Sequence, residues 1–221
     1  MKTLVLLSAL IGAVLSLAWT SPYSGVRNFH SRKVSADGAA VAFPSYYEPW
    51  MPTSAPGFAT SPYRSPAMVW YNPESNNIVF YDGAPRWITL IARPDPELVY
   101  FHEFSHWLQY SLAGTTNAVP DYVFDGLESD RSALVDRGYT NDLENVGGFE
   151  ADFDGRSDIY YGFFEKWDVD YGAGVPRAEA FAVLLSMVKT GRYGNLLDEF
   201  APDSKAAVER WLDDMRKDIA E

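Results

Sequence analysis

The sequence predicts an α+β fold in which a small sheet precedes a helical C-terminal half. Two β-rich runs, Met68–Tyr71 and Ile78–Tyr81, flank a turn-forming stretch of Asn, Pro and Ser and predict a β-hairpin. Apolar residues then recur at helical spacing over 95–112, 176–190 and 204–219. With 221 residues the chain is long enough to bury one ordinary apolar core.

The N-terminal stretch 1–18 has the pattern of a signal peptide. Lys2 precedes the apolar run Leu4–Leu17, and Ser16 and Ala18 are the small residues expected just before a cleavage point. The run is short for a membrane span, which needs about 20 apolar residues. We therefore expect a secreted protein, extracellular or periplasmic, with no stable membrane insertion after cleavage. An uncleaved anchor is the alternative.

Residues 19–66 are expected to form an irregular segment rich in Pro and Tyr, with one strand over 34–43. His30 lies alone in this segment, and a lone His is ordinarily a surface or packed residue. Residues 67–221 then form the main folded domain. After the hairpin, the stretch 87–91 is expected to add another strand or an early helical turn.

The middle of the chain is acidic and rich in turns. Over 115–148 we expect a solvated loop that holds a short helix at 131–137. A further helix is predicted over 149–167, although Gly155 and Gly162 lower its helix propensity.

The three long helices carry boundary signals. Asp95 suits an N-cap and Pro96 suits the first turn of the helix that follows. Pro176 and Gly191 bound the second helix, and Ser204 is expected to cap the last.

The charge balance argues against two classes of partner. The chain has 30 acidic and 18 basic residues, a formal net charge of −12, and no run of Lys or Arg. We therefore expect no binding to nucleic acid or to an anionic membrane surface. The chain also has no cysteine, so it has no disulfide, thiol nucleophile or Cys-ligated metal.

His102, Glu103 and His106 form an H-E-x-x-H motif inside the predicted helix 95–112. Residues four apart share a helix face, so both imidazoles can reach one metal ion, with Glu103 close to a water molecule beside it. The chain has only three histidines, and the aromatic neighbours of this pair predict a buried helix. A buried group of this kind is costly unless a metal compensates it, so the motif predicts a zinc site.

A catalytic zinc site needs a third protein ligand, and no histidine follows His106. Two carboxylates are candidates. Glu179 lies early in a strongly apolar helix, where a carboxylate needs a partner, whereas Glu150 opens an acidic stretch. That stretch also offers a candidate calcium site, although it does not match an EF-hand loop; its carboxylates are Asp152, Asp154 and Asp158.

Three further motifs follow the H-E-x-x-H helix: Tyr171–Gly172, then Ala178–Ala182, then Ala201–Pro202 before a final helix. Together the motifs resemble the C-terminal catalytic domain of the anthrax lethal factor type, a gluzincin-type metallopeptidase. In that family H-E-x-x-H is followed by Tyr-Gly, by Glu-Phe-Phe-Ala with the third ligand, and by Ala-Pro. The likeness covers roughly residues 95–221.

The resemblance implies a zincin-like catalytic domain over 67–221, with a small sheet packed on the H-E-x-x-H helix. It implies zinc ligands at His102, His106 and Glu179, and it favours Glu179 over Glu150. This chain departs from the family pattern in residue type, with Ala180 and Val183 where the family has Phe and Glu. It also departs in spacing, since the gap after His106 is longer and Tyr171 lies one residue further from Glu179.

The expected function is zinc-dependent hydrolysis of a protein or peptide substrate, with Glu103 as the general base. The resemblance implies that Tyr171 stabilises the oxyanion; by sequence alone Tyr160 and Tyr161 are equally available. Strands before the motif helix suit an extended peptide, which can bind by strand addition. Two other classes stay open: a secreted, non-catalytic metal-containing protein, and a carbohydrate- or wall-binding protein suggested by the aromatic-rich segment before residue 81.

Overall fold

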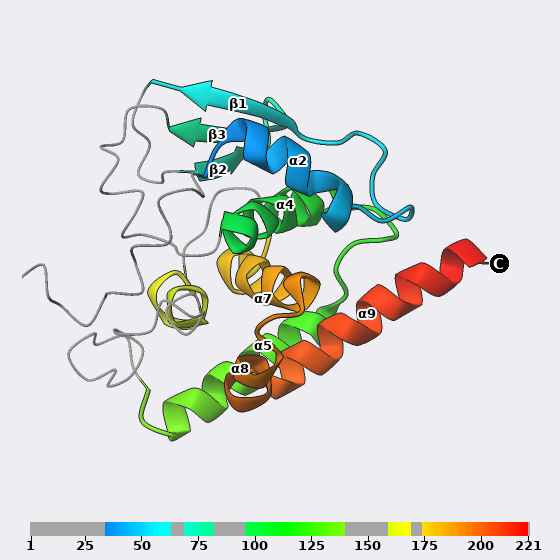
Figure 1. Cartoon of the computed structure of the whole chain (residues 1–221). Helices are drawn as coiled ribbons and strands as arrows, with labels where there is room; N and C mark the ends of the chain where they lie inside the picture. Colours follow the sequence, from blue (N-terminus) through cyan, green and yellow to red (C-terminus); the bar gives the residue numbers. More distant parts are fainter. Residues whose placement is uncertain (1–33, 63–68, 82–95, 140–158, 169–173, 221) are drawn as a thin grey trace, which may run out of the picture. The chain divides into compact units, whose positions relative to one another are not determined.

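The structure is a computed structural model that describes residues 34–62, 69–81, 96–139, 159–168 and 174–220. The elements below all belong to one compact unit, Val34–Glu221. These elements are helices and one small sheet, which confirms the mixed α+β class (Figure 1). The predicted signal peptide, His30 and the stretch 87–91 lie outside the described residues.

Helix α2, Ala36–Tyr46, replaces the strand predicted over 34–43. Ser35 begins the helix, because its Oγ accepts a hydrogen bond from the Gly38 N–H at 3.1 Å. Phe43 and Tyr46 lie three residues apart on one buried face. The Phe43 ring packs edge-on against two aromatic rings of the next helix in the core. The alternating small residues favour a strand locally, but this tertiary packing stabilises a helix.

The sheet has three strands in the order β1-β3-β2: β1 is Gly57–Ser61, β2 is Val69–Asn72 and β3 is Asn77–Tyr81. Strands β2 and β3 pair antiparallel, which confirms the predicted hairpin. Asn76 has φ of 50° in the connecting turn, a left-handed conformation that Asn adopts more readily than most residues. Strand β1 lies in the segment predicted to be irregular, and it pairs parallel with β3.

Helix α4, Pro96–Leu112, lies at the centre of the described core and confirms the predicted helix. Figure 1 shows α4 between α2 on one side and α7, Ala178–Thr190, on the other, and α4 packs most extensively on α7. The sheet contacts α4 mainly through β2. Helix α7 confirms the helix predicted over 176–190. Gly191, with φ of 66°, caps its C-terminal end.

Helices α5, Asp121–Asp136, and α9, Pro202–Ala220, pack along each other (Figure 1). The sequence predicted a loop over 115–148 with only a short helix at 131–137, and this was wrong for α5. Apolar residues at helical spacing, such as Val123 and Leu127, bury one face of this longer helix. The predicted cap of α9 was also wrong. The helix begins at Pro202, and the Asp130 carboxylate of α5 accepts hydrogen bonds from the N–H groups of its first turn.

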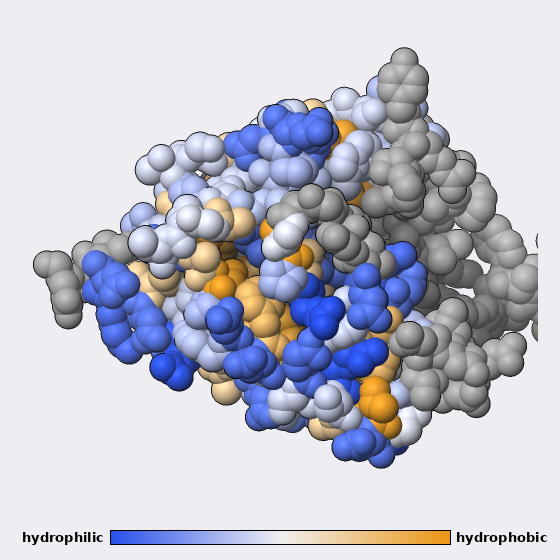
Figure 2. Space-filling view, turned by 180° about the vertical axis from the view of Figure 1, so that it is seen from behind, coloured by the Kyte–Doolittle hydropathy of each residue, from blue (hydrophilic) through white to orange (hydrophobic). Residues whose placement is uncertain are grey.

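Two shorter elements complete the described fold: the π-helix η3, Tyr161–Glu165, and helix α8, Gly194–Phe200. Element η3 lies within the helix predicted over 149–167, most of which is outside the described residues. None of the described helices is long and apolar enough to cross a membrane. The face turned away in Figure 1 is mostly hydrophilic, and hydrophobic residues gather most clearly in a zone near its centre (Figure 2).

Candidate metal centre

Helix α4 places His102 and His106 on one face, one helical turn apart. Both side chains lie in the core, with residue exposures of 4 % and 8 %. Their Nε2 atoms are 3.2 Å apart, and the two rings meet edge to face with centroids 4.8 Å apart. The helix as a whole is buried, since its other faces carry large aromatic side chains such as Phe104 and Trp107, and the two polar rings therefore also lie in the core.

Glu179 reaches this pair from the first turn of α7 and is itself only 7 % exposed. Its Oε2 lies 3.1 Å from the His102 Nε2, and its Oε1 lies 3.5 Å from the His106 Nε2. The structure thus brings together the three residues predicted as metal ligands, from helices far apart in the sequence.

The electrostatics of the group favour an anionic Glu179. Burial raises the pKa of this carboxyl group, but hydrogen bonds from His102 and then His106 lower it by more, so the pKa lies well below its ordinary value. Glu179 is therefore a carboxylate at neutral pH, the form that binds a cation.

The donor atoms fit one small divalent ion. Ligands placed tetrahedrally at about 2.0–2.1 Å from a zinc ion lie about 3.3–3.4 Å from one another. The two histidine Nε2 atoms lie 3.2 Å apart, and Glu179 approaches each of them with a different oxygen, His102 with Oε2 at 3.1 Å and His106 with Oε1 at 3.5 Å. With one ligand atom from each residue, the three ligand atoms of this buried group all lie within 4.8 Å of one another. Two imidazole nitrogens and one carboxylate also match the donor types of zinc sites that keep one position open. The group can therefore hold a metal ion, and the identity of that ion as zinc stays a prediction.

Glu103 follows His102 in α4 and is buried beside the pair. It shares a helix face with Tyr110, seven residues further along. The Tyr110 ring lies 5.7 Å from that of Tyr71 in β2, so the face that carries Glu103 also meets β2, an outer strand among the described strands. The predicted general base therefore lies on the side of α4 that borders β2.

Several other predicted residues cannot be placed in this group. Glu150, the three aspartates of the candidate calcium site, and Tyr171 lie outside the described residues. Tyr160, one of the alternative tyrosines, is buried with its ring stacked on Phe164 at 5.8 Å.

Two residues that the sequence did not predict hold the turn before α7 in place. Gln109 of α4 donates a hydrogen bond to the Pro176 carbonyl, and Arg177 immediately precedes α7 in a left-handed conformation. Gln109 was detectable in principle, because it lies seven residues after His102 on the same helix face. The left-handed conformation of Arg177 has no sequence signal.

No family model, curated protein or solved structure matches the chain. The likeness to the lethal factor type therefore rests on the motifs alone and stays a prediction.

Proposed function

We propose that the chain is a secreted zinc metallopeptidase whose ligands are His102, His106 and Glu179. The observation that supports this most strongly is the buried group itself: the ligand atoms of its three residues lie within 4.8 Å of one another, and Glu103 follows His102 in the sequence. Export is supported by the signal-peptide pattern of residues 1–18.

A zinc ion in this group would supply a Lewis acid that polarises the scissile carbonyl and makes a water molecule more acidic. Glu103 acts as the general base: its carboxylate takes a proton from the attacking water as the new C–O bond forms. The same carboxyl group then gives that proton to the leaving amine as the C–N bond breaks. Tyr171 is the proposed donor to the oxyanion, on the family resemblance.

The substrate is an extended peptide that runs beside β2. This strand is an edge of the sheet among the described strands, and it is the strand that packs most on α4. A peptide added there pairs through backbone hydrogen bonds, which require no particular side chain. The edge of β2 borders the face of α4 that carries Glu103, so a bound peptide passes the general base.

Exchange of Glu103 for Gln tests the proposal. We expect Glu103→Gln to bind zinc as the wild type does and to lose about 10²- to 10⁴-fold in peptide cleavage, because the proton acceptor is removed and the ligands are kept. Glu97→Gln is the matched control: it lies in the first turn of the same helix, pairs with Arg192, and should retain activity. Cleavage by Glu103→Gln at the wild-type rate, with zinc still bound, would indicate a structural or non-catalytic metal site.

A further inference from the structure

The start of α7 decides where Glu179 lies against α4. Glu179 is the second residue of this helix, which begins at Ala178. The preceding residue, Arg177, has φ of 49° and ψ of 38°. A residue with a Cβ adopts this left-handed conformation only at a cost, so surrounding contacts must hold it.

The Arg177 side chain supplies such contacts. Its Nε and Nη2 donate to the Glu128 Oε1 of α5 at 2.9 and 2.7 Å, and its Nη1 donates to the Trp167 carbonyl at 3.4 Å. The guanidinium also lies over the Trp167 ring, with Cζ 4.5 Å from the centroid. Meanwhile the Arg177 carbonyl accepts the hydrogen bond of the Phe181 N–H at 3.0 Å, at the start of α7. One residue thus joins the beginning of α7 to α5 and to the segment after η3.

Gln109 of α4 also contacts this turn. It is 3 % exposed and lies three residues after His106 in α4. Its Nε2 donates to the carbonyl of Pro176 at 3.2 Å, one residue before Arg177. The histidine-bearing face of α4 is therefore bonded to the turn from which α7 begins.

We propose that Arg177 and Gln109 are positioning residues that set the Glu179 carboxylate against His102 and His106. This inference rests on the metal centre proposed above. Groups that orient ligands commonly change metal affinity by about 10- to 100-fold when they are removed. Because both residues act through the start of α7, their loss should weaken metal binding while the histidines stay in place.

Zinc affinity of the full chain, measured by competition with a chromophoric chelator, tests the inference. The variants are Arg177→Gly and Gln109→Met. Glycine adopts the left-handed conformation freely, so Arg177→Gly removes the side-chain contacts without adding backbone strain. Methionine keeps the length of Gln109 but cannot donate to the Pro176 carbonyl. We expect the dissociation constant for zinc to rise about 10- to 100-fold in each variant, with an altered absorption spectrum when cobalt replaces zinc.

Arg131→Ala is the matched control. Arg131 also lies over Trp167, at 5.0 Å, and donates to a backbone carbonyl, that of Phe163, but it does not belong to the turn before α7. The zinc affinity of Arg131→Ala should stay within about twofold of the wild type, since the contacts made by Arg177 and Gln109 are untouched. Unchanged affinity in Arg177→Gly and Gln109→Met would overturn the inference, as would an equal loss in Arg131→Ala. A wild-type chain that binds no zinc would instead contradict the metal centre itself.

Discussion

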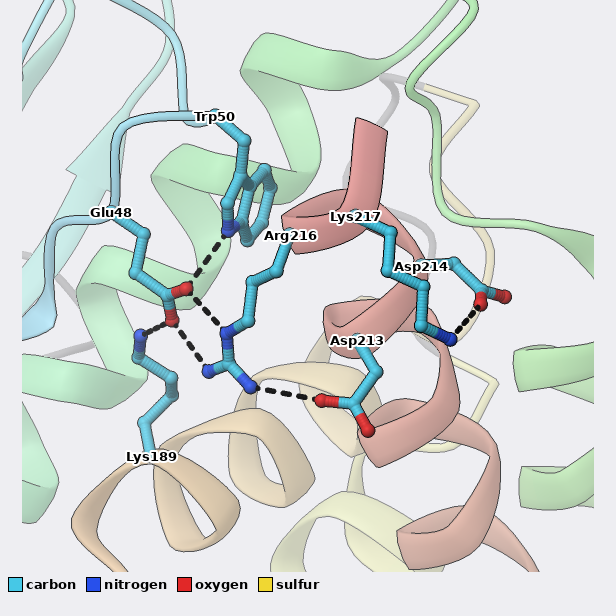
Figure 3. A network of polar contacts seen from close by, with 7 residues as sticks. All are labelled: Glu48, Trp50, Lys189, Asp213, Asp214, Arg216 and Lys217. Atoms are coloured by element: carbon cyan, nitrogen blue, oxygen red, sulfur yellow. Dashed lines mark hydrogen bonds and ion pairs between the residues drawn. The ribbon is translucent and has the colours of Figure 1, made fainter. Parts of the chain in front are cut away.

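Glu48 is a partly buried carboxylate held by two basic side chains. It follows α2, and its carboxylate accepts hydrogen bonds from Lys189 in the last turn of α7 and from Arg216 of α9, at 2.5 to 2.9 Å (Figure 3). The Trp50 Nε1 donates to the same carboxylate at 3.0 Å. Burial raises the pKa of Glu48, but Arg216 and then Lys189 lower it by more, to about 2.

Glu48→Gln should therefore destabilise the protein in a pH-dependent way. The pKa is depressed in the folded state, so the stabilisation by Glu48 is present above its ordinary pKa of about 4.5 and is lost as the pH falls toward 2. At pH 7 we expect a loss of about 1–3 kcal/mol, because the largely buried Lys189 loses its charged partner. Urea unfolding of the metal-free chains at pH 7 and pH 3 measures this loss.

The difference between wild type and Glu48→Gln should shrink at pH 3, because the Glu48 carboxyl group of the unfolded chain is then mostly protonated while that of the folded chain is still mostly ionised. Glu74→Gln, at an exposed position in the β2–β3 turn, serves as the control and should change stability by less than about 0.5 kcal/mol. A Glu48→Gln deficit of the same size at both pH values would contradict the assignment.

At the scale of elements, η3 and α7 approach each other closely next to Glu179, one of the three residues that can hold a metal ion. A Cβ built on Gly162 would lie 3.0 Å from the Ala180 Cα and 3.2 Å from the Val183 Cγ2. Ala180 is the residue next to Glu179 on α7. A π-helical turn often marks a functional region, and here it packs against α7, the helix that carries Glu179, the proposed third ligand.

Gly162→Ala should therefore force η3 and α7 apart. We expect a loss of about 1–3 kcal/mol in the free energy of unfolding, since the neighbouring atoms are backbone and a packed side chain. Gly194→Ala at the start of α8 is the control: a Cβ there meets only the flexible Lys205 Nζ, at 4.0 Å. Thermal unfolding compares the two, and equal stability of both variants would show that the η3–α7 contact adapts.

The elements that the sequence predicted correctly carry their own local signals. Helices α4 and α7 have strong apolar patterns, and the β2–β3 hairpin has a turn between two β-rich runs. Helix α2 and strand β1 were missed because both depend on distant partners: Phe43 packs on α4, and β1 pairs in parallel with β3. The same limit applies to the site. The spacing of His102 and His106 is local, whereas the choice of Glu179 and the support from Arg177 depend on how α7 meets α4.

At the scale of the whole molecule, an ion held by His102, His106 and Glu179 would join α4 to α7, which pack closely on each other (Figure 1). Binding to the folded state alone stabilises a protein by about 2.7 kcal/mol at 100 times the dissociation constant. Zinc at that excess should therefore raise the melting temperature by about 5–10 °C over the chelator-treated chain. Calorimetry with and without zinc measures the shift. His106→Ala is the control, and it should lose most of this zinc-dependent rise in melting temperature.

The number of zinc ions bound per chain, in wild type and in two glutamate variants, tests the proposed centre most directly. Equilibrium dialysis followed by elemental analysis gives this number and the affinity. We predict one zinc ion per wild-type chain, the same in Glu150→Gln, and at least about tenfold weaker binding in Glu179→Gln, since a neutral amide replaces a carboxylate ligand. Zinc bound by Glu179→Gln as tightly as by the wild type would contradict a centre formed by His102, His106 and Glu179.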